Sequence, residues 1–296
     1  MTGEPLTLVN YYDRLFDQVL TGQYSLSIRI DPDGLSFSVY SHLVSRYIGI
    51  ESVLLHQGSA FSSGETAKTL FSDRLKDFLQ KHEWILNPFR HVSLIVHSPT
   101  YTLIPHALYK PESKAEYLAF AHQYEQTNVV HEQFLNAAEA WLVYAVNNSI
   151  NEVIEQYFGS ARLLHHAGAM IETILPHYRH NELQNPVFVN VRQGSFDIIV
   201  LNEGRLRYCN SFSWKANEDL VYYLIFVLDQ LALNPENVPV MLSGLLEPDS
   251  ALFALLQQYI RHVSFMQNPE ISKPGISLPV SNDYKFFDLL NPGLCE

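Results

Sequence analysis

Residues 187–214 read VFVNVRQGSFDIIVLNEGRLRYCNSFSW, and this stretch says more about the fold than any other in the chain. Short apolar runs occupy 187–191, 196–201 and 206–212, and glycine-containing turns separate them. Apolar runs joined by tight glycine turns predict antiparallel strands, each paired with its neighbour in sequence. The stretch therefore predicts a three-stranded meander.

The residues after this meander alternate between helix and strand patterns. Apolar residues at helical spacing predict helices over Glu218–Leu231 and Pro248–Tyr259. Short, strongly apolar runs predict buried strands over Val238–Leu242 and His262–Met266. Strands interleaved with helices indicate a mixed sheet that is covered by helices.

The same order of elements occurs earlier in the chain. Tyr24–Ile30 (YSLSIRI) and Leu35–Tyr40 (LSFSVY) alternate polar and apolar residues, and the strong turn sequence Asp31–Gly34 (DPDG) joins them. Ile48–His56 is a third apolar run, and a helical pattern over Gly64–His82 follows it. The repeat predicts an α/β protein of two similar lobes, each a mixed sheet with a three-strand meander flanked by helices, with a cleft between them.

The segment between the meanders contains the predicted boundary between the lobes. We expect an N-terminal extension over 1–22 with a short amphipathic stretch, lobe I over 23–165, and lobe II with a C-terminal tail over 166–296. The elements predicted in the middle segment are strands over His91–His97, Pro99–Leu108, Trp141–Val146 and Ala161–His166, and helices over Ser113–Gln123, Ser149–Phe158 and Ala169–Leu175, the last stopped by Pro176.

Composition excludes several classes of protein. The 296 residues are 47% hydrophobic and 17% charged, which excludes intrinsic disorder. A formal net charge of −12 without a basic stripe argues against a nucleic-acid partner. The N-terminus lacks a signal-peptide pattern, and the longest apolar run, Val221–Leu228, is far too short to span a membrane. Cys209 and Cys295 follow no spacing motif and are expected to be free thiols, which indicates a cytoplasmic protein.

The segment 187–256 resembles a known superfamily. VFVNVRQGSFDIIVLNEGRLRYCNSFSW, then NEDLVYYLIFVLDQ, then VPVMLSGLLEPDSALFALLQQYI is similar to the second lobe of actin, Hsp70 and sugar kinases. Trp141–Pro176 resembles the transition between the lobes of those proteins. The resemblance covers roughly Tyr24–Met266 and is closest to the actin-like cytoplasmic components of type IV pilus and type II secretion assembly, and to an uncharacterised Bacteroidetes family with an actin-like ATPase fold. It implies a two-lobed, duplicated ribonuclease H-like fold.

The resemblance also implies where a nucleotide would lie. In that superfamily the first hairpin of each lobe holds the phosphates of ATP, acidic residues position Mg²⁺, and a Gly-Gly segment lies against the adenosine. By position, the candidate cleft and cofactor-binding residues are Asp31, Asp33, Gly34, Asn190, Arg192, Gly194, Ser195, Ser243 and Gly244.

The sequence departs from the superfamily pattern at several of these positions. Asn190 stands where an Asp is expected and Arg192 where a Gly is expected, so a carboxylate and a close backbone approach are lost. Leu245 and Leu246 follow Gly244, and two bulky side chains would crowd a purine. We therefore assign no catalytic residue and expect no metal site.

Two functions follow from this comparison. The favoured one is a pseudo-ATPase, a non-catalytic scaffold or interaction protein whose partner is another protein, with membrane-associated machinery as one possibility. The alternative is an ATPase or switch that binds ATP and Mg²⁺ in the cleft through Arg192, Gly194, Ser195 and Ser243–Gly244. A sugar or acetate kinase is disfavoured because no catalytic acid can be located.

The histidines and the C-terminal aromatic residues fall outside these motifs. His165–His166, His177 and His180 form the densest group of histidines, but they lack the spacing of a structural zinc site and are expected to be scattered surface or interface residues. Tyr284 and Phe286–Phe287 either dock a peptide by strand addition or fold back over the core of the chain, and the second is favoured.

Overall fold

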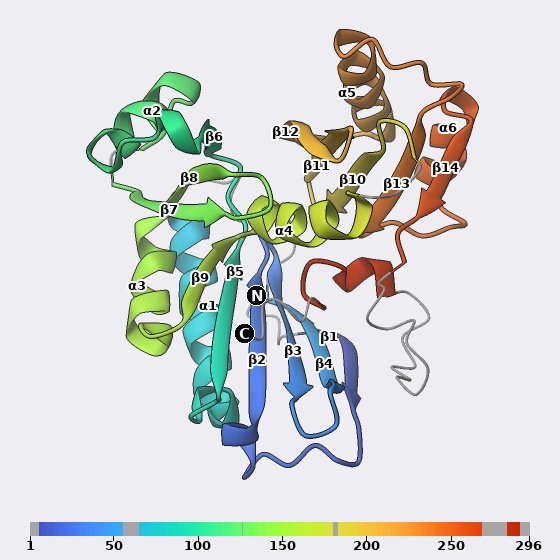
Figure 1. Cartoon of the computed structure of the whole chain (residues 1–296). Helices are drawn as coiled ribbons and strands as arrows, with labels where there is room; N and C mark the ends of the chain where they lie inside the picture. Colours follow the sequence, from blue (N-terminus) through green and yellow to red (C-terminus); the bar gives the residue numbers. More distant parts are fainter. Residues whose placement is uncertain (1–5, 56–64, 126, 180–182, 268–282, 291–296) are drawn as a thin grey trace.

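The computed structural model describes residues 6–55, 65–125, 127–179, 183–267 and 283–290. These residues form a six-stranded sheet in lobe I, a five-stranded sheet in lobe II and a small three-stranded sheet (Figure 1). Helix α4 (His166–Tyr178) lies between the two larger sheets. The two-lobed α/β architecture that the repeated meander predicts is confirmed. The lobe boundaries at 22/23 and 165/166 stay predictions.

The sheet of lobe I contains the first meander. Its strands, in spatial order, are β1 (Leu6–Tyr12), β4 (Arg46–Leu54), β3 (Gly34–Ser41), β2 (Tyr24–Ile30), β5 (His91–Val96) and β9 (Arg162–His165). The meander β2–β3–β4 is antiparallel, whereas β5 pairs with β2, and β9 with β5, in parallel. Helices α1 (Glu65–Lys81) and α3 (Asn148–Phe158) cover one face of this sheet.

Strand β2 is buried along its whole length because both of its faces are covered. Leu26 and Ile28 belong to the main core on the side of α1. Arg29 points to the opposite face, where it lies beside Ile95 of β5 in the strand register. The residues that cover this second face come from the other end of the chain, because Ile95 packs against Phe286 and its neighbours.

The C-terminal segment (residues 283–290) folds back between the lobes. It begins with the short 3₁₀-helix η5 (Asp283–Phe286), and Lys285 forms an ion pair with Glu247 of lobe II. On the side of lobe I, the Ser38 hydroxyl of β3 donates to the Leu289 carbonyl at 3.2 Å. The buried apolar side chains of the C-terminal segment are Tyr284, Phe286, Phe287, Leu289 and Leu290. The prediction that the aromatic tail folds back over the core is confirmed.

The sheet of lobe II contains the second meander. Its strands, in spatial order, are β12 (Arg205–Ser213), β11 (Ser195–Asn202), β10 (Val187–Arg192), β13 (Pro239–Gly244) and β14 (His262–Phe265). Helices α5 (Asn217–Gln230) and α6 (Ala251–Tyr259) lie on its outer side (Figure 1). Helix α5 begins where Asp219 accepts the Ala216 N–H at 3.0 Å, so this first-turn acid caps the helix.

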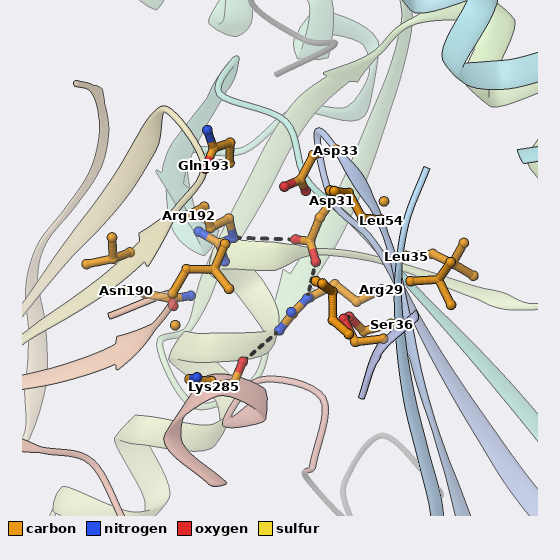
Figure 2. A pocket seen from close by; sticks show the side chains of 17 residues that line it. Arg29, Asp31, Asp33, Leu35, Ser36, Leu54, Asn190, Arg192, Gln193 and Lys285 are labelled. Atoms are coloured by element: carbon orange, nitrogen blue, oxygen red, sulfur yellow. Dashed lines mark hydrogen bonds and ion pairs between the residues drawn. The ribbon is translucent and has the colours of Figure 1, made fainter. Parts of the chain in front are cut away.

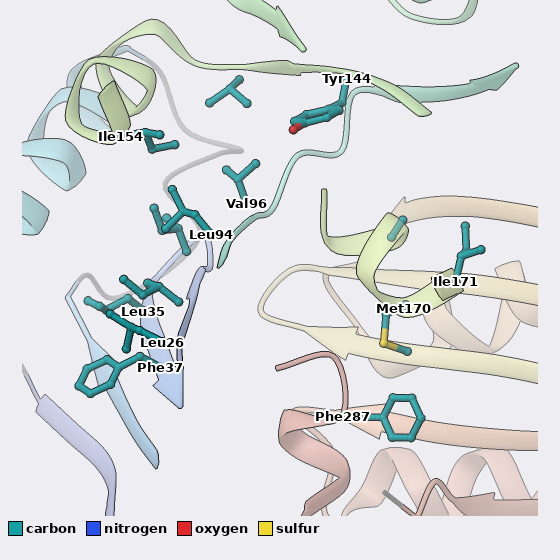
Figure 3. Packing of buried hydrophobic residues seen from close by; sticks show 14 of the residues in the cluster. Leu26, Leu35, Phe37, Leu94, Val96, Tyr144, Ile154, Met170, Ile171 and Phe287 are labelled. Atoms are coloured by element: carbon teal, nitrogen blue, oxygen red, sulfur yellow. The ribbon is translucent and has the colours of Figure 1, made fainter. Parts of the chain in front are cut away.

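One hydrophobic core continues from lobe I into lobe II. Met170 and Ile171 of α4 are fully buried and pack in the same cluster as Leu94 and Val96 of β5. Phe287 of the C-terminal segment belongs to this cluster as well. Figure 3 shows α4 and Phe287 on one side of the cluster and the strands of lobe I on the other. The helix and the C-terminal segment therefore join the lobes.

The small sheet is inserted between β5 and β9. It consists of β6 (Tyr101–Pro105), β8 (Ala140–Val146) and β7 (Val129–Leu135), in this spatial order, with α2 (Lys114–Ala121) packed against it. The sequence did not predict β7, because its residues VVHEQFL do not alternate cleanly. The sequence also missed β1, which extends the sheet of lobe I through antiparallel pairing with β4.

The end of α4 corrects another prediction. Pro176 lies inside the helix, so the expectation that it stops the helix is wrong. Proline removes only its own N–H from the helix, and the Arg179 N–H still reaches the Leu175 carbonyl at 2.9 Å. The remaining short 3₁₀-helices are η1 (Thr21–Gln23), η2 (Glu83–Leu86), η3 (His106–Leu108) and η4 (Pro111–Ser113). Within the described ranges, no helix combines the length and apolarity needed to cross a membrane.

Candidate functional site in the cleft between the lobes

The first hairpins of the two lobes meet across the cleft (Figure 2). In lobe I the Asp31 N–H donates to the Gly34 carbonyl at 2.9 Å and closes the DPDG turn. A Cβ at Gly34 would lie 2.0 Å from the Val53 carbonyl, so only glycine fits against β4. In lobe II, Gln193 and Gly194 form the turn between β10 and β11, and Gly194 has a φ of 72°. Both hairpins thus form as predicted.

Arg29 lies at the base of the lobe I hairpin and binds two carboxylates. Its Nε donates to Asp31 Oδ2 at 2.7 Å, and its Nη1 donates to Asp288 Oδ1 at 2.5 Å. The same Nη1 lies 3.4 Å from the Lys285 carbonyl of the C-terminal segment. Burial lowers the pKa of Arg29, but the charges of Asp288 and Asp31 raise it by more than burial lowers it. The guanidinium therefore stays charged.

Arg192 makes the matching contacts from lobe II. It forms an ion pair with Asp197 of the neighbouring strand β11. Its Nε lies 3.8 Å from Asp31 Oδ1 and its Nη2 lies 3.7 Å from Asp288 Oδ2. Burial raises the pKa of Asp197, but Arg192 and His166 outweigh this effect and hold it well below its usual value. Arg192 therefore links a carboxylate of each lobe with the C-terminal segment.

We call Arg29, Asp31, Arg192, Asp197 and Asp288 the cleft ion network. All except Asp31 are buried, and the Asp31 side chain is only 14% exposed. Removing such charges from water costs free energy that their mutual attraction only partly offsets. The network therefore fixes how the lobes meet more than it adds to stability.

Asp33 lies at the rim of the same cleft and is not part of the network. Burial and the nearby charge of Asp31 raise the pKa of its carboxyl to about 6. At neutral pH this carboxyl is therefore still mostly ionised, although it takes up a proton more readily than an ordinary aspartate.

The space left in the cleft is small. The cavity lined by Asp31, Asp33, Asn190 and Arg192 has a volume of about 40 Å³. Nucleotide-sized ligands occupy pockets of roughly 300–1,000 Å³, whereas one water takes about 30 Å³ of liquid volume. The side chains of the cleft ion network fill the space in which a nucleotide would lie. In this form the residues do not fit ATP, and the Asp31 carboxylate faces two arginines instead of an open Mg²⁺ position.

Residues 243–246, the segment expected beside an adenosine, pack against lobe II itself. Gly244 has a φ of 87°, and a Cβ there would lie 2.1 Å from the Val191 carbonyl, so this glycine serves contact between β13 and β10. The following N–H, of Leu245, donates to the same carbonyl at 2.7 Å. Leu246 is buried and takes part in the core of lobe II. The absence of a side chain at Gly244 thus allows strands β13 and β10 to lie close together.

The cavity unites six of the nine residues predicted from the sequence. They are Asp31, Asp33, Gly34, Asn190, Arg192 and Gly244. Ser195 lies outside its lining, and its hydroxyl is 3.3 Å from His97 Nε2. Ser243 is buried on β13, and its hydroxyl has no hydrogen-bond partner among the described residues. Gly194 also lies outside the lining and serves the turn.

The sequence did not predict the histidines that lie beneath the network. His97, His165 and His166 are fully buried. The rings of His97 and His166 stack with centroids 4.5 Å apart, and the His165 ring is tilted against His166 at 4.1 Å. The expectation of scattered surface or interface histidines is therefore wrong for His165 and His166, although it holds for the exposed His177. His180 and Cys295 lie outside the described residues.

The buried histidines are held neutral. Burial lowers the pKa of His97 and His165 well below the usual value, and it lowers the pKa of His166 as well. His166 Nδ1 accepts the Ser98 N–H at 3.3 Å, so its Nε2 carries the proton and donates to Asp197 at 3.1 Å. Among the residues that the structure describes, no group of three or more His, Cys, Asp or Glu side chains is arranged to hold a metal.

The sequence also missed Arg29, Asp197 and Asp288 as cleft residues. Arg29 and Asp197 are charged residues within strand patterns that are otherwise apolar or small, as in YSLSIRI and FDIIV. A charge in a strand that is buried on both faces requires a buried partner. This signal in the sequence could have identified Arg29 and Asp197. Asp288 had no such signal, because it follows an aromatic patch in a tail that shows no helix or strand periodicity.

Comparison with solved structures shows which known fold this architecture resembles. A Bacteroides thetaiotaomicron protein with an actin-like ATPase fold and unknown function is 24% identical, over 86% of this chain and 95% of that chain, with a TM-score of 0.74. A chain of a solved PilM–PilN type IV pilus biogenesis complex is 11% identical, over 90% of this chain and 96% of that chain, with a TM-score of 0.56. The chain has the actin-like ATPase fold, as the resemblance implied.

Comparison with sequence families shows to which family the chain belongs. No curated protein matches the chain. The family model described as "Protein of unknown function (DUF3822)" matches residues 13–263, which is most of the chain. The chain therefore belongs to the DUF3822 family.

Proposed function

We propose that this chain is a pseudo-ATPase, a non-catalytic protein that uses the actin-like fold as a scaffold for another protein. The observation that carries the proposal is the cleft ion network, which fills the cleft between the lobes. Hydrolysis of ATP needs room for the nucleotide, a carboxylate that orients Mg²⁺ or water, and close backbone approach to phosphate. Here the cavity is about 40 Å³, and Asn190 and Arg192 occupy the positions where the superfamily has Asp and Gly.

The proposed partner is a protein, and the proposed location is the cytoplasm. One relative of the same fold occurs in a complex, PilM with PilN in type IV pilus biogenesis, which is a precedent for this use of the fold. The net charge of −12 disfavours nucleic acid as the partner. The half-buried thiol of Cys209 is free, which suits a reducing compartment.

ATP hydrolysis by the purified full-length chain tests this proposal. We expect phosphate release with Mg²⁺-ATP to equal that of a buffer control. The matched variants are Asp31→Asn and Asp33→Asn, which remove the two carboxylates that stand nearest to the superfamily positions. Mg²⁺-dependent hydrolysis by the wild type that either variant abolishes, while the variant keeps its circular-dichroism spectrum, would show that the proposal is wrong.

A further inference from the structure

The outer helices of lobe II form an apolar groove. Helices α5 and α6 pack against each other on the outer side of the lobe II sheet (Figure 1). The groove along them has a volume of about 490 Å³, and we call it the helix groove. It is separate from the cleft between the lobes, since the two cavities share no lining residue. Its apolar lining residues are Val221, Tyr222, Ile225, Phe226, Leu255 and Tyr259.

Large aromatic side chains of the helix groove are exposed to solvent. Tyr222 is 65% exposed, Phe226 is 48% exposed and Tyr259 is 55% exposed. Tyr222 and Phe226 lie one turn apart on α5, and their rings stack with centroids 6.4 Å apart. Single exposed apolar residues are ordinary on a protein surface, whereas several that line one groove indicate a binding surface.

The walls of the helix groove determine which kind of segment can occupy it. Both walls are helices, and the backbone N–H and C=O groups inside a helix are already bonded along the chain. An extended segment would find no backbone donor or acceptor there for its own amides. A helical segment satisfies its own backbone and contributes only side chains, and its ridges can pack into the groove of other helices. The walls therefore select a helix.

The charges around the helix groove select a basic partner. Residues 216–260, which contain both helices, include six acidic residues and no Lys, Arg or His. Of the six, Glu236 and Glu247 form ion pairs with basic residues from outside this range. Glu218 and Asp229 line the groove and lie about 16 Å apart along α5, at about 1.5 Å per residue. Among the residues that the structure describes, these two carboxylates have no ion-pair partner.

The position of Asp229 is not explained by the stability of its own helix. Glu218 lies in the first turn of α5, where an acidic side chain complements the helix dipole. Asp229 lies in the last turn, where the dipole favours a cation and no basic residue is present. A cation of a bound partner would meet both the Asp229 carboxylate and the negative end of the helix.

A second copy of this chain does not suit the helix groove. If two copies of α5 packed antiparallel across a twofold axis, Glu218 of one copy would lie beside Asp229 of the other. Like charges placed opposite each other at an interface disfavour association. The aromatic side chains would meet, but both ends of the contact would repel.

We infer that the helix groove binds an amphipathic helix of a partner protein, about three turns long, with an apolar stripe and Lys or Arg near both ends. The stripe packs against Tyr222, Phe226 and Tyr259, and the basic side chains pair with Glu218 and Asp229. This inference rests on the proposed scaffold role, and it names the surface and the chemistry by which the partner is recognised.

Selection from a phage-displayed library tests the inference, with the full chain as bait. Each peptide is a helical frame of about 14 residues, or roughly four turns, with randomised positions. We expect the enriched helices to carry apolar residues at i, i+4 and i+7 and Lys or Arg near both ends. Fluorescence anisotropy of the synthetic peptides gives their dissociation constants. These constants should rise when NaCl is raised from about 50 to about 500 mM, because salt screens exposed ion pairs.

Matched variants separate binding in the groove from general attraction to an acidic protein. Phe226→Ser removes an apolar wall and Asp229→Lys reverses a charge, and each should weaken binding about tenfold or more. Asp229→Lys places a cation where the dipole of α5 favours it, so loss of folding cannot explain its effect. Phe120→Ser and Glu116→Lys make the same changes at exposed positions of α2 and should leave binding unchanged. Thermal unfolding near the wild-type midpoint shows that each variant folds.

Several results would overturn the inference. They are an empty selection, enriched helices that are acidic or uncharged, and equal affinities for the variants of the groove and of α2. A dimer in light scattering that Phe226→Ser abolishes would also overturn it, because a second copy would then occupy the groove. None of these measurements involves nucleotide, so a failure here leaves the test of the pseudo-ATPase proposal unaffected.

Discussion

The Asp288 carboxylate lies 2.5 Å from Arg29 Nη1, although 259 positions separate the two residues in the chain. The same carboxylate faces Arg192 of lobe II at 3.7 Å. One residue of the C-terminal segment thus meets an arginine from each lobe in the cleft between the lobes. We conclude that the end of the chain fills the cleft and keeps the lobes together.

Replacing Asp288 should destabilise the protein strongly. Asp288→Ala leaves Arg29 and Arg192 with one counter-charge fewer in a buried site, and breaking a buried ion pair in this way costs about 3–5 kcal/mol. Urea unfolding at neutral pH measures the loss. The exposed Asp249→Ala serves as the control and should change the free energy of unfolding by less than about 0.5 kcal/mol.

A double substitution separates charge from packing at the same site. Arg29→Met combined with Asp288→Leu removes both members of the pair and keeps apolar volume, so it should recover much of the stability that Asp288→Ala loses. Together with the single variants Arg29→Met and Asp288→Leu, the double variant gives the coupling between the two side chains. If Asp288→Ala proves as stable as wild type, the C-terminal segment does not keep the two lobes together through Asp288.

Asp33 gives the protein a specific dependence on pH. Burial and Asp31 raise the pKa of its carboxyl to about 6, above the ordinary value of 3.8. Its contribution to stability is therefore fully present below about pH 4 and lost as the pH rises through 6. Asp33→Asn stays neutral, so its stability relative to wild type should increase by about 1–2 kcal/mol between pH 4 and pH 8. Urea unfolding of both proteins across this range measures the effect, and a difference that does not vary with pH would contradict it.

The aromatic residues of the C-terminal segment should contribute to the core. Phe287 is 1% exposed and packs in the cluster that joins the lobes, so Phe287→Ala should cost about 3–5 kcal/mol. Phe120 is 96% exposed, and Phe120→Ala should change stability by less than about 0.5 kcal/mol. Thermal and urea unfolding of the two alanine variants provide the comparison. Equal stabilities would mean that the segment only rests on the surface.

The sequence predicted the elements whose patterns are local. Strand β2 was predicted with its observed bounds, Tyr24–Ile30, because alternation and the DPDG turn lie within a few residues of each other. Strand β1 was missed because its partner β4 begins more than thirty positions away and LTLVNYY lacks regular alternation. Pro176 was misjudged because a proline near the end of a helix removes a single hydrogen bond and can be tolerated there.

The candidate site was predicted only in part, for a physical reason. The resemblance to the superfamily assigned the hairpin positions Asp31 and Arg192, and the structure places both in the cleft. Their actual partners, Arg29, Asp197 and Asp288, depend on how the lobes and the C-terminal segment pack. A pair such as Arg29 and Asp288 leaves no periodic trace in a single sequence.

Nucleotide binding tests the central claim, that side chains occupy the cleft between the lobes, most directly. Thermal unfolding of the full chain should be recorded with and without millimolar Mg²⁺-ATP, with ADP and GTP in parallel. We predict the same midpoint in every sample. A ligand at 100 times its dissociation constant stabilises the folded state by about 2.7 kcal/mol, so binding would raise the midpoint in a dose-dependent and saturable way. Such a rise with Mg²⁺-ATP would contradict the account, because Arg29, Arg192 and Asp288 would then have to separate.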